Sequence, residues 1–257
     1  MVFYKTEEEI DIIRKGAQIL SQAHGEVASL IRAGITTLEL DARAEEFIQD
    51  HGGRPSFKGY NGFPYSLCIS VNSVVVHGFP GKYVLQPGDI VSIDCGVFFE
   101  GYHSDSAYTH PVEEVSEETQ HLLAVTKASL YLGIEKALSG NRMGDIAATI
   151  QANAEKEGFS VVRELVGHGI GRNLHEAPEV PNYGKRGQGL KLQSGLVLAI
   201  EPMVNAGTKN IVQEADGWTI RTRDNKPSAH FEHTVVVRKD QAEVLTTFDY
   251  IEKRASI

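Results

Sequence analysis

Ionisable side chains interrupt the apolar, strand-like segments of this chain at five separate places. The five residues, four acids and one histidine, are Asp94, Asp105, His168, Glu201 and Glu232. A carboxylate in such a segment is costly to bury unless it is paired, protonated or bound to a cation. No matching set of Lys or Arg stands near them in the sequence. We therefore expect a fold in which these distant segments meet around cations.

Hydrophobic periodicity predicts helices and strands in two similar rounds. Two capping boxes, Thr6 with Glu9 and Thr36 with Glu39, mark the first two helix starts. The expected helices span 6–34, 36–52, 116–138 and 144–157, and the expected strands span 67–71, 73–77, 89–99, 102–110, 160–166, 196–200, 217–223 and 231–238. This order predicts an α+β fold.

The two rounds also repeat each other in spacing. Gly34 and Gly52 end the helices of the first round, and Gly140 and Gly158 follow them at an offset of 106 positions. Identity between the rounds is low, so a chance match is the alternative. If the repeat is real, the chain is one domain over 1–257, made of related halves at about 6–110 and 116–240 with the site between them.

Composition excludes some classes of protein. The net charge of −9 argues against a nucleic-acid binder that depends on bulk charge. The basic residues Lys185, Arg186, Arg221 and Arg223 are expected to be solvated surface charges.

The sequence also favours a cytoplasmic protein. The chain shows no secretory signal, and no apolar run approaches the ~18 residues of a membrane helix. Cys68 and Cys95 lie in apolar runs, which favours reduced thiols in the cytoplasm.

Asp94 and Asp105 are expected on a hairpin that turns near Glu100 and Gly101. Their odd separation places both side chains on one face of the sheet when the loop has an even length. Two such carboxylates raise each other's pKa, and a cation removes the conflict. The alternative is that one Asp caps a turn while the other is exposed.

The other three residues have contexts that favour ligands over ordinary core or edge positions. His168 is flanked by glycines, so that neighbouring side chains do not screen its ring. Glu201 ends an apolar run and is followed by Pro202, and Glu232 alternates with His230 and Thr234. Each alone could be a core histidine or a strand-edge charge.

Oxygen-rich ligation with one nitrogen suits Mn(II), Fe(II), Co(II) or Zn(II) and excludes a thiolate site. A pair of such ions can activate water for the hydrolysis of amides or phosphoesters. The sequence has no nucleophile elbow, phosphate-binding glycine loop or His-Glu-x-x-His zinc helix that would indicate another chemistry.

In this order the motifs resemble type I methionine aminopeptidase, in its short bacterial form. The matching segments, spread over about 6–246, are Val-Val-His77-Gly, Ile-Asp94, Ser-Asp105, Gly-His168-Gly-Ile-Gly, His175-Glu-Ala-Pro, Ile-Glu201-Pro and Glu232-His-Thr. The resemblance implies the pita-bread fold, a curved antiparallel sheet backed by helices and built from two pseudo-symmetric halves. It also implies a single catalytic domain that holds two divalent metal ions (Co, Mn, Fe or Zn).

Residue by residue, the resemblance assigns roles. The four acids and the histidine named first are the metal ligands, and Glu201 is also the general base. His77 contacts the scissile amide nitrogen, and His175 donates to the carbonyl oxygen. The implied methionine pocket consists of Tyr60, Phe63, Cys68 and Trp218, with Phe57 and Leu174 at its rim. A monovalent cation is implied near Asn72, Val74 and Ser228.

Three positions depart from patterns in the family. Leu174 stands where many members have Phe, and Phe63 where some have Tyr, which affects the shape of the pocket. Gly96 lacks a hydroxyl that some members place beside the metal ligands. The segment 176–192, rich in Pro, Gly and basic residues, is expected to be a surface loop.

Three functions fit these observations. The first is removal of the N-terminal methionine from nascent polypeptides with a small second residue, by a monomer that docks on the ribosome or acts free of it. The second is cleavage before proline by a metallopeptidase of the same fold, although such relatives usually carry an extra N-terminal domain. The third is a non-catalytic binding module on the same scaffold, which would normally have lost ligands.

Overall fold

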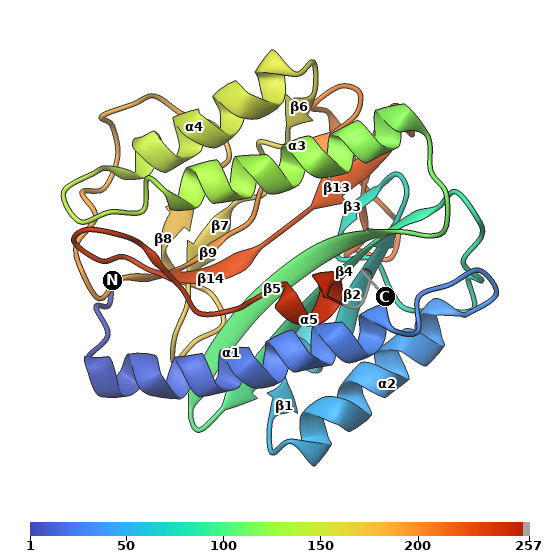
Figure 1. Ribbon diagram of the computed structural model, residues 1–257, viewed down its shortest axis with the longest axis horizontal. Helices are drawn as coiled ribbons and strands as arrows, with labels where there is room; N and C mark the ends of the chain where they lie inside the picture. The colour runs from blue at the N-terminus through green and yellow to red at the C-terminus, as the bar shows by residue number, and fades with distance from the viewer. Residues whose placement is uncertain (254–257) are drawn as a thin grey trace.

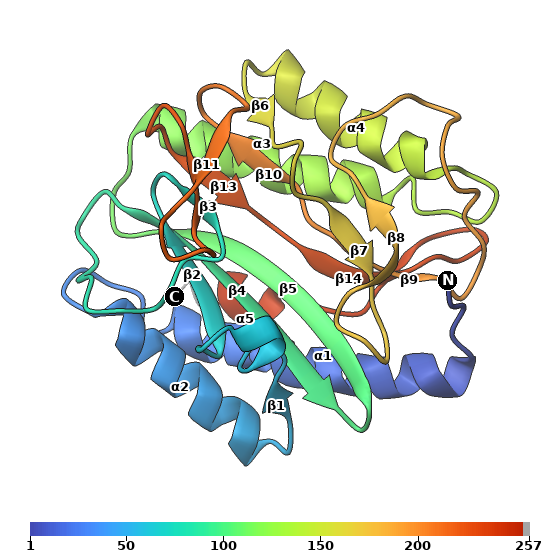
Figure 2. The ribbon, with the colours of Figure 1, turned by 180° about the vertical axis from the view of Figure 1, so that it is seen from behind.

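The computed structural model describes residues 1–253, in which helices cover one side of a set of antiparallel strands. The helices are α1 Glu7–Ala28, α2 Thr37–Asp50, α3 Glu117–Ile134, α4 Met143–Lys156 and the short α5 Asp249–Glu252. Helices α1 and α2 lie along one edge of the molecule and α3 and α4 along the opposite edge, with the strands between (Figure 1). Seen from behind, the strands lie in front of the helices (Figure 2).

The second helix of each pair, α2 and α4, begins in the same way. The Thr36 N–H donates to the Glu39 carboxylate at 2.8 Å, and the Arg142 N–H donates to the Asp145 carboxylate at 2.8 Å. In each half the side chain at the third helical position thus satisfies a backbone donor that the helix leaves free. Gly140 has a φ of 102°, a conformation that residues with a Cβ rarely adopt.

The strands form four small sheets. The first contains β1 Arg54–Pro55, β2 Leu67–Val71, β4 Ile90–Phe99 and β5 Tyr102–Pro111. One three-stranded sheet contains β6 Ser160–Val161, β10 Met203–Asn205 and β13 Ser228–His230. The other contains β3 Val74–Val76, β11 Ile211–Gln213 and β12 Ile220–Thr222. The five-stranded sheet contains β7 Gly167–Gly169, β8 Glu176–Val180, β9 Val197–Ile200, β14 His233–Val236 and β15 Glu243–Val244.

Hydrogen bonds join β5, in the first half of the chain, to residues 232–234, in the second half. The Glu232 N–H donates to the Ala107 carbonyl at 2.9 Å, and the Ser106 hydroxyl donates to the Glu232 carbonyl at 2.8 Å. The Thr234 hydroxyl accepts from the Asp105 N–H at 2.9 Å and donates to the Asp105 carbonyl at 2.7 Å. These bonds fix the backbones of two of the five ionisable residues beside each other.

Several sequence-based boundaries were too long. The strand expected over 160–166 is only Ser160–Val161, and the one expected over 231–238 is only His233–Val236. The first and third helices end at Ala28 and Ile134, earlier than predicted. The loop expected over 176–192 is wrong at its start, because Glu176–Val180 pairs with β7 as an edge strand. The sequence did not reveal this pairing because β7 is only three residues long and two of them are glycines, so it shows no strand periodicity.

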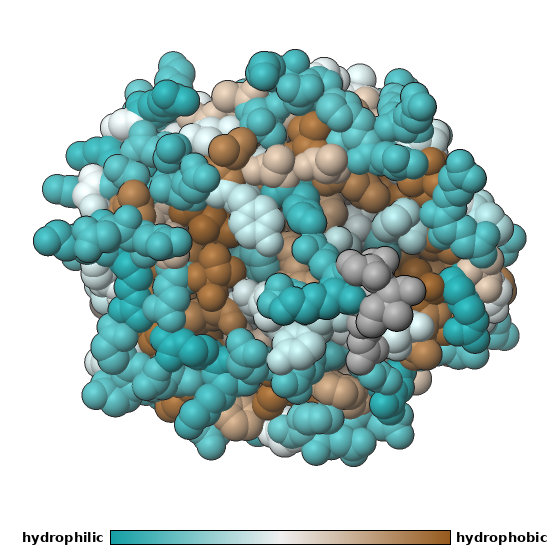
Figure 3. Space-filling model, viewed as in Figure 1, coloured by the Kyte–Doolittle hydropathy of each residue, from teal (hydrophilic) through white to brown (hydrophobic). Residues whose placement is uncertain are grey.

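Apolar side chains from both helix pairs pack against the strands. Fully buried examples are Leu40 of α2 and Ile146 of α4. On the helix side most exposed residues are hydrophilic, with apolar surface between the helix pairs (Figure 3). Cys68 and Cys95 are both buried and free, in agreement with the expectation of reduced thiols. Within the described residues, no helix is both long and apolar enough to span a membrane.

Candidate active site

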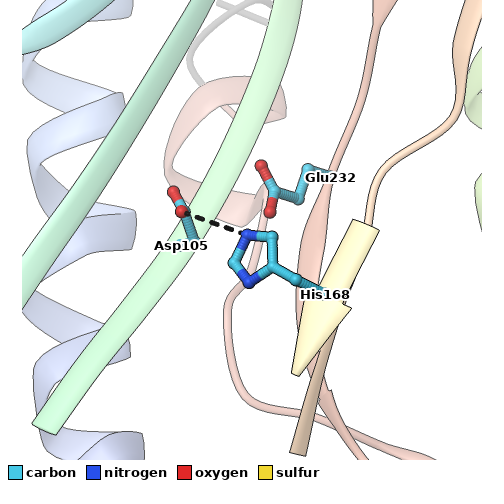
Figure 4. Close-up of side chains that lie close together, drawn as sticks. All are labelled: Asp105, His168 and Glu232. Atoms are coloured by element: carbon cyan, nitrogen blue, oxygen red, sulfur yellow. Dashed lines mark ion pairs between the residues drawn. The ribbon is translucent and has the colours of Figure 1, made fainter. Parts of the chain in front are cut away.

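The five ionisable residues predicted to converge line one cavity of about 230 Å³. Asp94 lies on β4, Asp105 on β5 and His168 on β7, while Glu201 directly follows β9 and Glu232 directly precedes β14. Asp105 on β5, His168 on β7 and Glu232, just before β14, point toward one another (Figure 4). Each of these three offers one ligand atom, and these atoms lie within 4.8 Å of one another.

The hairpin of β4 and β5 places the two aspartates on one face. Asp94 is opposite Ala107 and Gly96 is opposite Asp105, so the aspartates are diagonal neighbours whose side chains leave the same side of the sheet. The two-residue turn, Glu100 and Gly101, has positive φ angles of 46° and 91°. Such a turn matches the twist of the flanking strands and fixes their register.

His168 is held with one nitrogen directed at the acids. Its Nδ1 is 2.9 Å from the Gly169 carbonyl, which leaves Nε2 facing the cavity. A Cβ on Gly167 would lie 2.4 Å from the Ala199 carbonyl, and one on Gly169 would lie 2.5 Å from that of Ala177. The flanking glycines thus allow β7 to pack closely between its neighbouring strands.

The distances around His168 are those of ligands that share an ion. Its Nε2 is 3.7 Å from Glu201 Oε1 and 4.0 Å from Asp105 Oδ2. These separations exceed a hydrogen bond. Two atoms that each lie about 2.0–2.2 Å from one metal are separated by at most about 4.4 Å. The arrangement therefore fits a divalent cation better than direct pairing of the side chains.

The electrostatics of the cluster lead to the same conclusion. Burial raises the pKa of Asp94 to about 7, and burial together with the neighbouring Asp94 and Glu201 raises the pKa of Asp105 well above its usual range. Burial and the charge of nearby acids also raise the pKa values of Glu201 and Glu232. Asp94 Oδ1 and Glu232 Oε1 are buried without a hydrogen-bond partner among the described residues. Bound cations would satisfy these oxygens and remove the repulsion.

Two further histidines border the same cavity. His77 has a φ of 59°, which is unusual for a residue with a side chain and occurs most often at functional sites. Burial lowers the pKa of His77 to about 4 and also lowers the pKa of His175, so that both rings are neutral near pH 7. The His175 ring lies 4.2 Å from that of His168, and its Nδ1 is 2.8 Å from the Tyr60 hydroxyl.

All six residues of the predicted methionine pocket line this cavity: Phe57, Tyr60, Phe63, Cys68, Leu174 and Trp218. Phe63 packs edge-on against Trp218, with ring centroids 5.2 Å apart. A Cβ on Gly96 would lie 2.8 Å from both Phe57 Cε1 and Ser56 Cβ. The packing of the pocket rim therefore leaves no space for a side chain at Gly96.

The predicted monovalent-cation residues lie near one another outside the cavity. The Ser228 N–H donates to the Asn72 carbonyl at 2.9 Å, and Val74 lies two residues from Asn72. That bond uses one lone pair of the carbonyl. The cation itself stays a prediction.

Sequence reasoning missed two relationships in the site. Tyr60 was placed in the pocket, but its hydroxyl also contacts His175. His230 was noted only for sharing a strand face with Glu232, yet its Nε2 lies 3.7 Å from Glu201 Oε2. Alternation along the strand could have indicated His230, whereas nothing in the sequence connects Tyr60 with His175.

Comparison with known proteins decides the family. A family model described as metallopeptidase family M24 matches residues 11–239. The chain belongs to metallopeptidase family M24. It is therefore a metal-dependent hydrolase of peptide bonds, which agrees with the oxygen-rich cluster.

Relatives within family M24 match nearly the whole chain. A methionine aminopeptidase of Clostridium perfringens is 55% identical over 246 residues, which cover 96% of this chain and 99% of the relative. Methionine aminopeptidase 1 of Bacillus subtilis is 50% identical with the same coverage.

Solved structures confirm the expected pita-bread fold. The methionine aminopeptidase of Thermotoga maritima superposes with a TM-score of 0.95 at 42% identity, covering 96% of this chain and 100% of that one. A prolidase of Pyrococcus furiosus reaches a TM-score of 0.79 at 23% identity and covers 95% of this chain but 65% of its own. The prolidase shares the fold and has additional chain.

Proposed function

We propose that this protein is a methionine aminopeptidase, which removes the N-terminal methionine from polypeptides whose second residue is small. The observation that carries the proposal is one cavity that joins a metal-binding cluster, two neutral histidines and an apolar pocket. The relatives that match almost the full length of the chain have the same activity in their names.

The proposed ligands are Asp94, Asp105, His168, Glu201 and Glu232, which would hold two divalent ions (Co, Mn, Fe or Zn). Four carboxylates supply enough negative charge and enough oxygens for a pair of ions. When bound, such ions supply Lewis acidity and lower the pKa of water toward neutrality. The buried oxygens of Asp94 and Glu232 that lack partners support this assignment.

Three side chains, Glu201, His77 and His175, have the remaining catalytic roles. Glu201 accepts the proton of the attacking water, since its side chain is 13% exposed and so more accessible than those of Asp105 (5%) and Glu232 (2%). His77 contacts the amide nitrogen of the scissile bond and assists its departure. His175 donates its Nε2–H to the carbonyl oxygen as negative charge develops there.

The apolar pocket selects the first residue of the substrate. Phe63 and Trp218 line the cavity and pack edge-on against each other, and aromatic rings suit a flexible and polarisable thioether. Leu174 is buried in its lining, where a shorter side chain than Phe leaves more room. We therefore expect this protein to accept substrates whose first side chain is longer than methionine more readily than family members with Phe at this position do.

A peptide panel tests the proposal. Met-Ala-Ser should be cleaved after loading with Mn(II) or Co(II), and Xaa-Pro peptides and peptides with a bulky second residue should not. The measurement is release of the first amino acid by a protein whose metal content has been determined. Cleavage of Xaa-Pro alone, or no cleavage of Met-Ala-Ser by metal-replete protein, would contradict the proposal.

The Tyr60→Phe substitution is expected to lower kcat for Met-Ala-Ser by about 10-fold, because a positioned acid–base group contributes about 10²–10⁴-fold. His175 Nδ1 is 2.8 Å from the Tyr60 hydroxyl, and in the Nε2–H tautomer that the proposed role requires, this hydroxyl is the donor. Tyr65→Phe is the matched control, since Tyr65 packs against Phe63 with ring centroids 6.3 Å apart and does not line the cavity. Equal kcat values for both variants would show that Tyr60 does not orient His175.

The proposal also covers the compartment, the oligomeric state and the substrates of the enzyme. We propose one catalytic domain that works as a cytoplasmic monomer on nascent polypeptides, with docking on the ribosome still a prediction. The buried free thiols of Cys68 and Cys95 support a reducing compartment. A monovalent cation near Asn72, Val74 and Ser228 belongs to the same proposal.

A further inference from the structure

His230 is a buried histidine whose backbone is fixed beside the metal-binding cluster. It ends β13, opposite Met203 of β10, and is 1% exposed. Its N–H donates to the Thr109 hydroxyl at 2.9 Å, and that hydroxyl donates to the His230 carbonyl at 2.7 Å. With both its N–H and its carbonyl bound to Thr109, the backbone of His230 has little freedom to move.

The ring of His230 faces two acids and no other described partner. Its Nε2 is 3.7 Å from Glu201 Oε2 and 3.9 Å from Glu232 Oε2. Neither ring nitrogen has a hydrogen-bond partner among the described residues. A buried polar group of this kind normally has a partner, so the site must supply one in the working enzyme.

The surroundings decide which nitrogen carries the proton. The His230 ring is buried, neither of its nitrogens has a hydrogen-bond partner among the described residues, and a neutral imidazole has one N–H to place. Once bound cations ionise Glu201 and Glu232, a lone pair at Nε2 would face two carboxylate oxygens and be repelled by both. A proton at Nε2 is attracted by the same oxygens, which favours the Nε2–H tautomer.

Glu201 presents its two oxygens to two different histidines. Oε1 lies 3.7 Å from His168 Nε2, on the side of the proposed metal ligands, and Oε2 lies 3.7 Å from His230 Nε2. Closing the second distance to a hydrogen bond requires a shift of less than 1 Å, about what a rotation of the carboxylate supplies. Such a bond would hold one oxygen away from the cluster and the other toward it.

We propose that His230 is a positioning residue whose Nε2–H donates to Glu201 and orients that carboxylate for metal binding and proton transfer. The inference rests on the proposed function, in which Glu201 is both ligand and base. Groups that orient a metal ligand in this way typically contribute about 10–100-fold to metal affinity or activity.

Two substitutions separate the donor from the bulk of the ring. His230→Gln keeps an N–H donor and His230→Leu removes it. We expect the Kd for Mn(II), measured by isothermal titration calorimetry, to rise about 10–100-fold in His230→Leu and to stay within about threefold in His230→Gln. The kcat for Met-Ala-Ser should follow the same order, with KM changed less. Equal affinities in all three proteins would overturn the proposal.

His110→Leu is the matched control. His110 is also a buried histidine with a ring nitrogen that has no partner among the described residues, but it does not line the cavity. Its replacement should leave the Kd for Mn(II) within about threefold. A loss equal to that of His230→Leu would mean that any buried histidine affects the metal through stability alone, and would overturn the specific role.

Magnetic resonance on the unmodified protein tests the tautomer without relying on a folded variant. In the Zn(II)-loaded protein, in which the acids are ionised, nitrogen-15 spectra of the imidazoles should show His230 protonated at Nε2, and protonation at Nδ1 would contradict the inference. In the Co(II) protein one strongly shifted, exchangeable imidazole N–H is expected, from His168. A second such signal, absent in both His230 variants, would make His230 a metal ligand instead. Neither readout uses a peptide, so each can fail while methionine release stands.

Discussion

Glu201→Gln is expected to lower kcat for Met-Ala-Ser by about 10³-fold, because a positioned general base contributes about 10²–10⁴-fold. The amide has the shape of the carboxylate but cannot accept the proton of the attacking water. It also removes one negative ligand from a cluster in which Glu201 Oε1 lies 3.7 Å from His168 Nε2. Steady-state kinetics at saturating Mn(II) would measure the loss of kcat.

The fold should survive this substitution. Burial raises the pKa of Glu201, so the metal-free protein already favours the neutral carboxyl that glutamine imitates. Circular dichroism and the Tm of the metal-free variant should therefore match those of the unmodified protein or exceed them slightly. Glu155→Gln, at an exposed position of α4, serves as the control with unchanged kcat. Retention of more than a tenth of kcat by Glu201→Gln would show that another group is the base.

Loading with Mn(II) is expected to raise the Tm more at pH 8 than at pH 6. The raised pKa values of the four acids mean that, without metal, their contribution to stability is present below about pH 4. This contribution is lost as the pH rises through the folded-state values, about 7 for Asp94. A bound cation replaces the protons, so its effect grows over the same pH range.

The size of this effect follows from mass action. At a free Mn(II) concentration of 100 times Kd, one site stabilises the folded state by about 2.7 kcal/mol, equivalent to about 5–10 °C in Tm for a chain of this size. Differential scanning calorimetry of chelated and loaded protein at both pH values provides the measurement. Asp105→Asn, which removes one acid of the cluster, should reduce the gain. An equal gain at pH 6 and pH 8 would mean that the acids bind metal without losing protons.

Local chemistry made part of the fold predictable from the sequence. The Thr36 and Glu39 capping box fixes a helix start with residues three positions apart, and the structure has that start. The turn at Glu100 and Gly101 sets the register of one hairpin, and from this the shared face of Asp94 and Asp105 followed. The ligand types and the pocket residues were inferred from motifs, and all of them line one cavity.

Contacts between distant segments were decided only by the tertiary structure. The pairing of β7 with β9, in which His168 is opposite Ala199, depends on close packing that leaves no room for a side chain at Gly167. The contact of Tyr60 with His175 joins residues 115 positions apart, and that of His230 with Glu201 depends on the pairing of β10 with β13.

The sequence by itself determined which side chains are available and which local elements carry them. The tertiary structure determined which oxygen of Glu201 faces His168 and which faces His230. Periodicity and capping act over a few residues, whereas the direction of a buried carboxylate depends on the summed packing and charge of strands that meet only when the chain is folded.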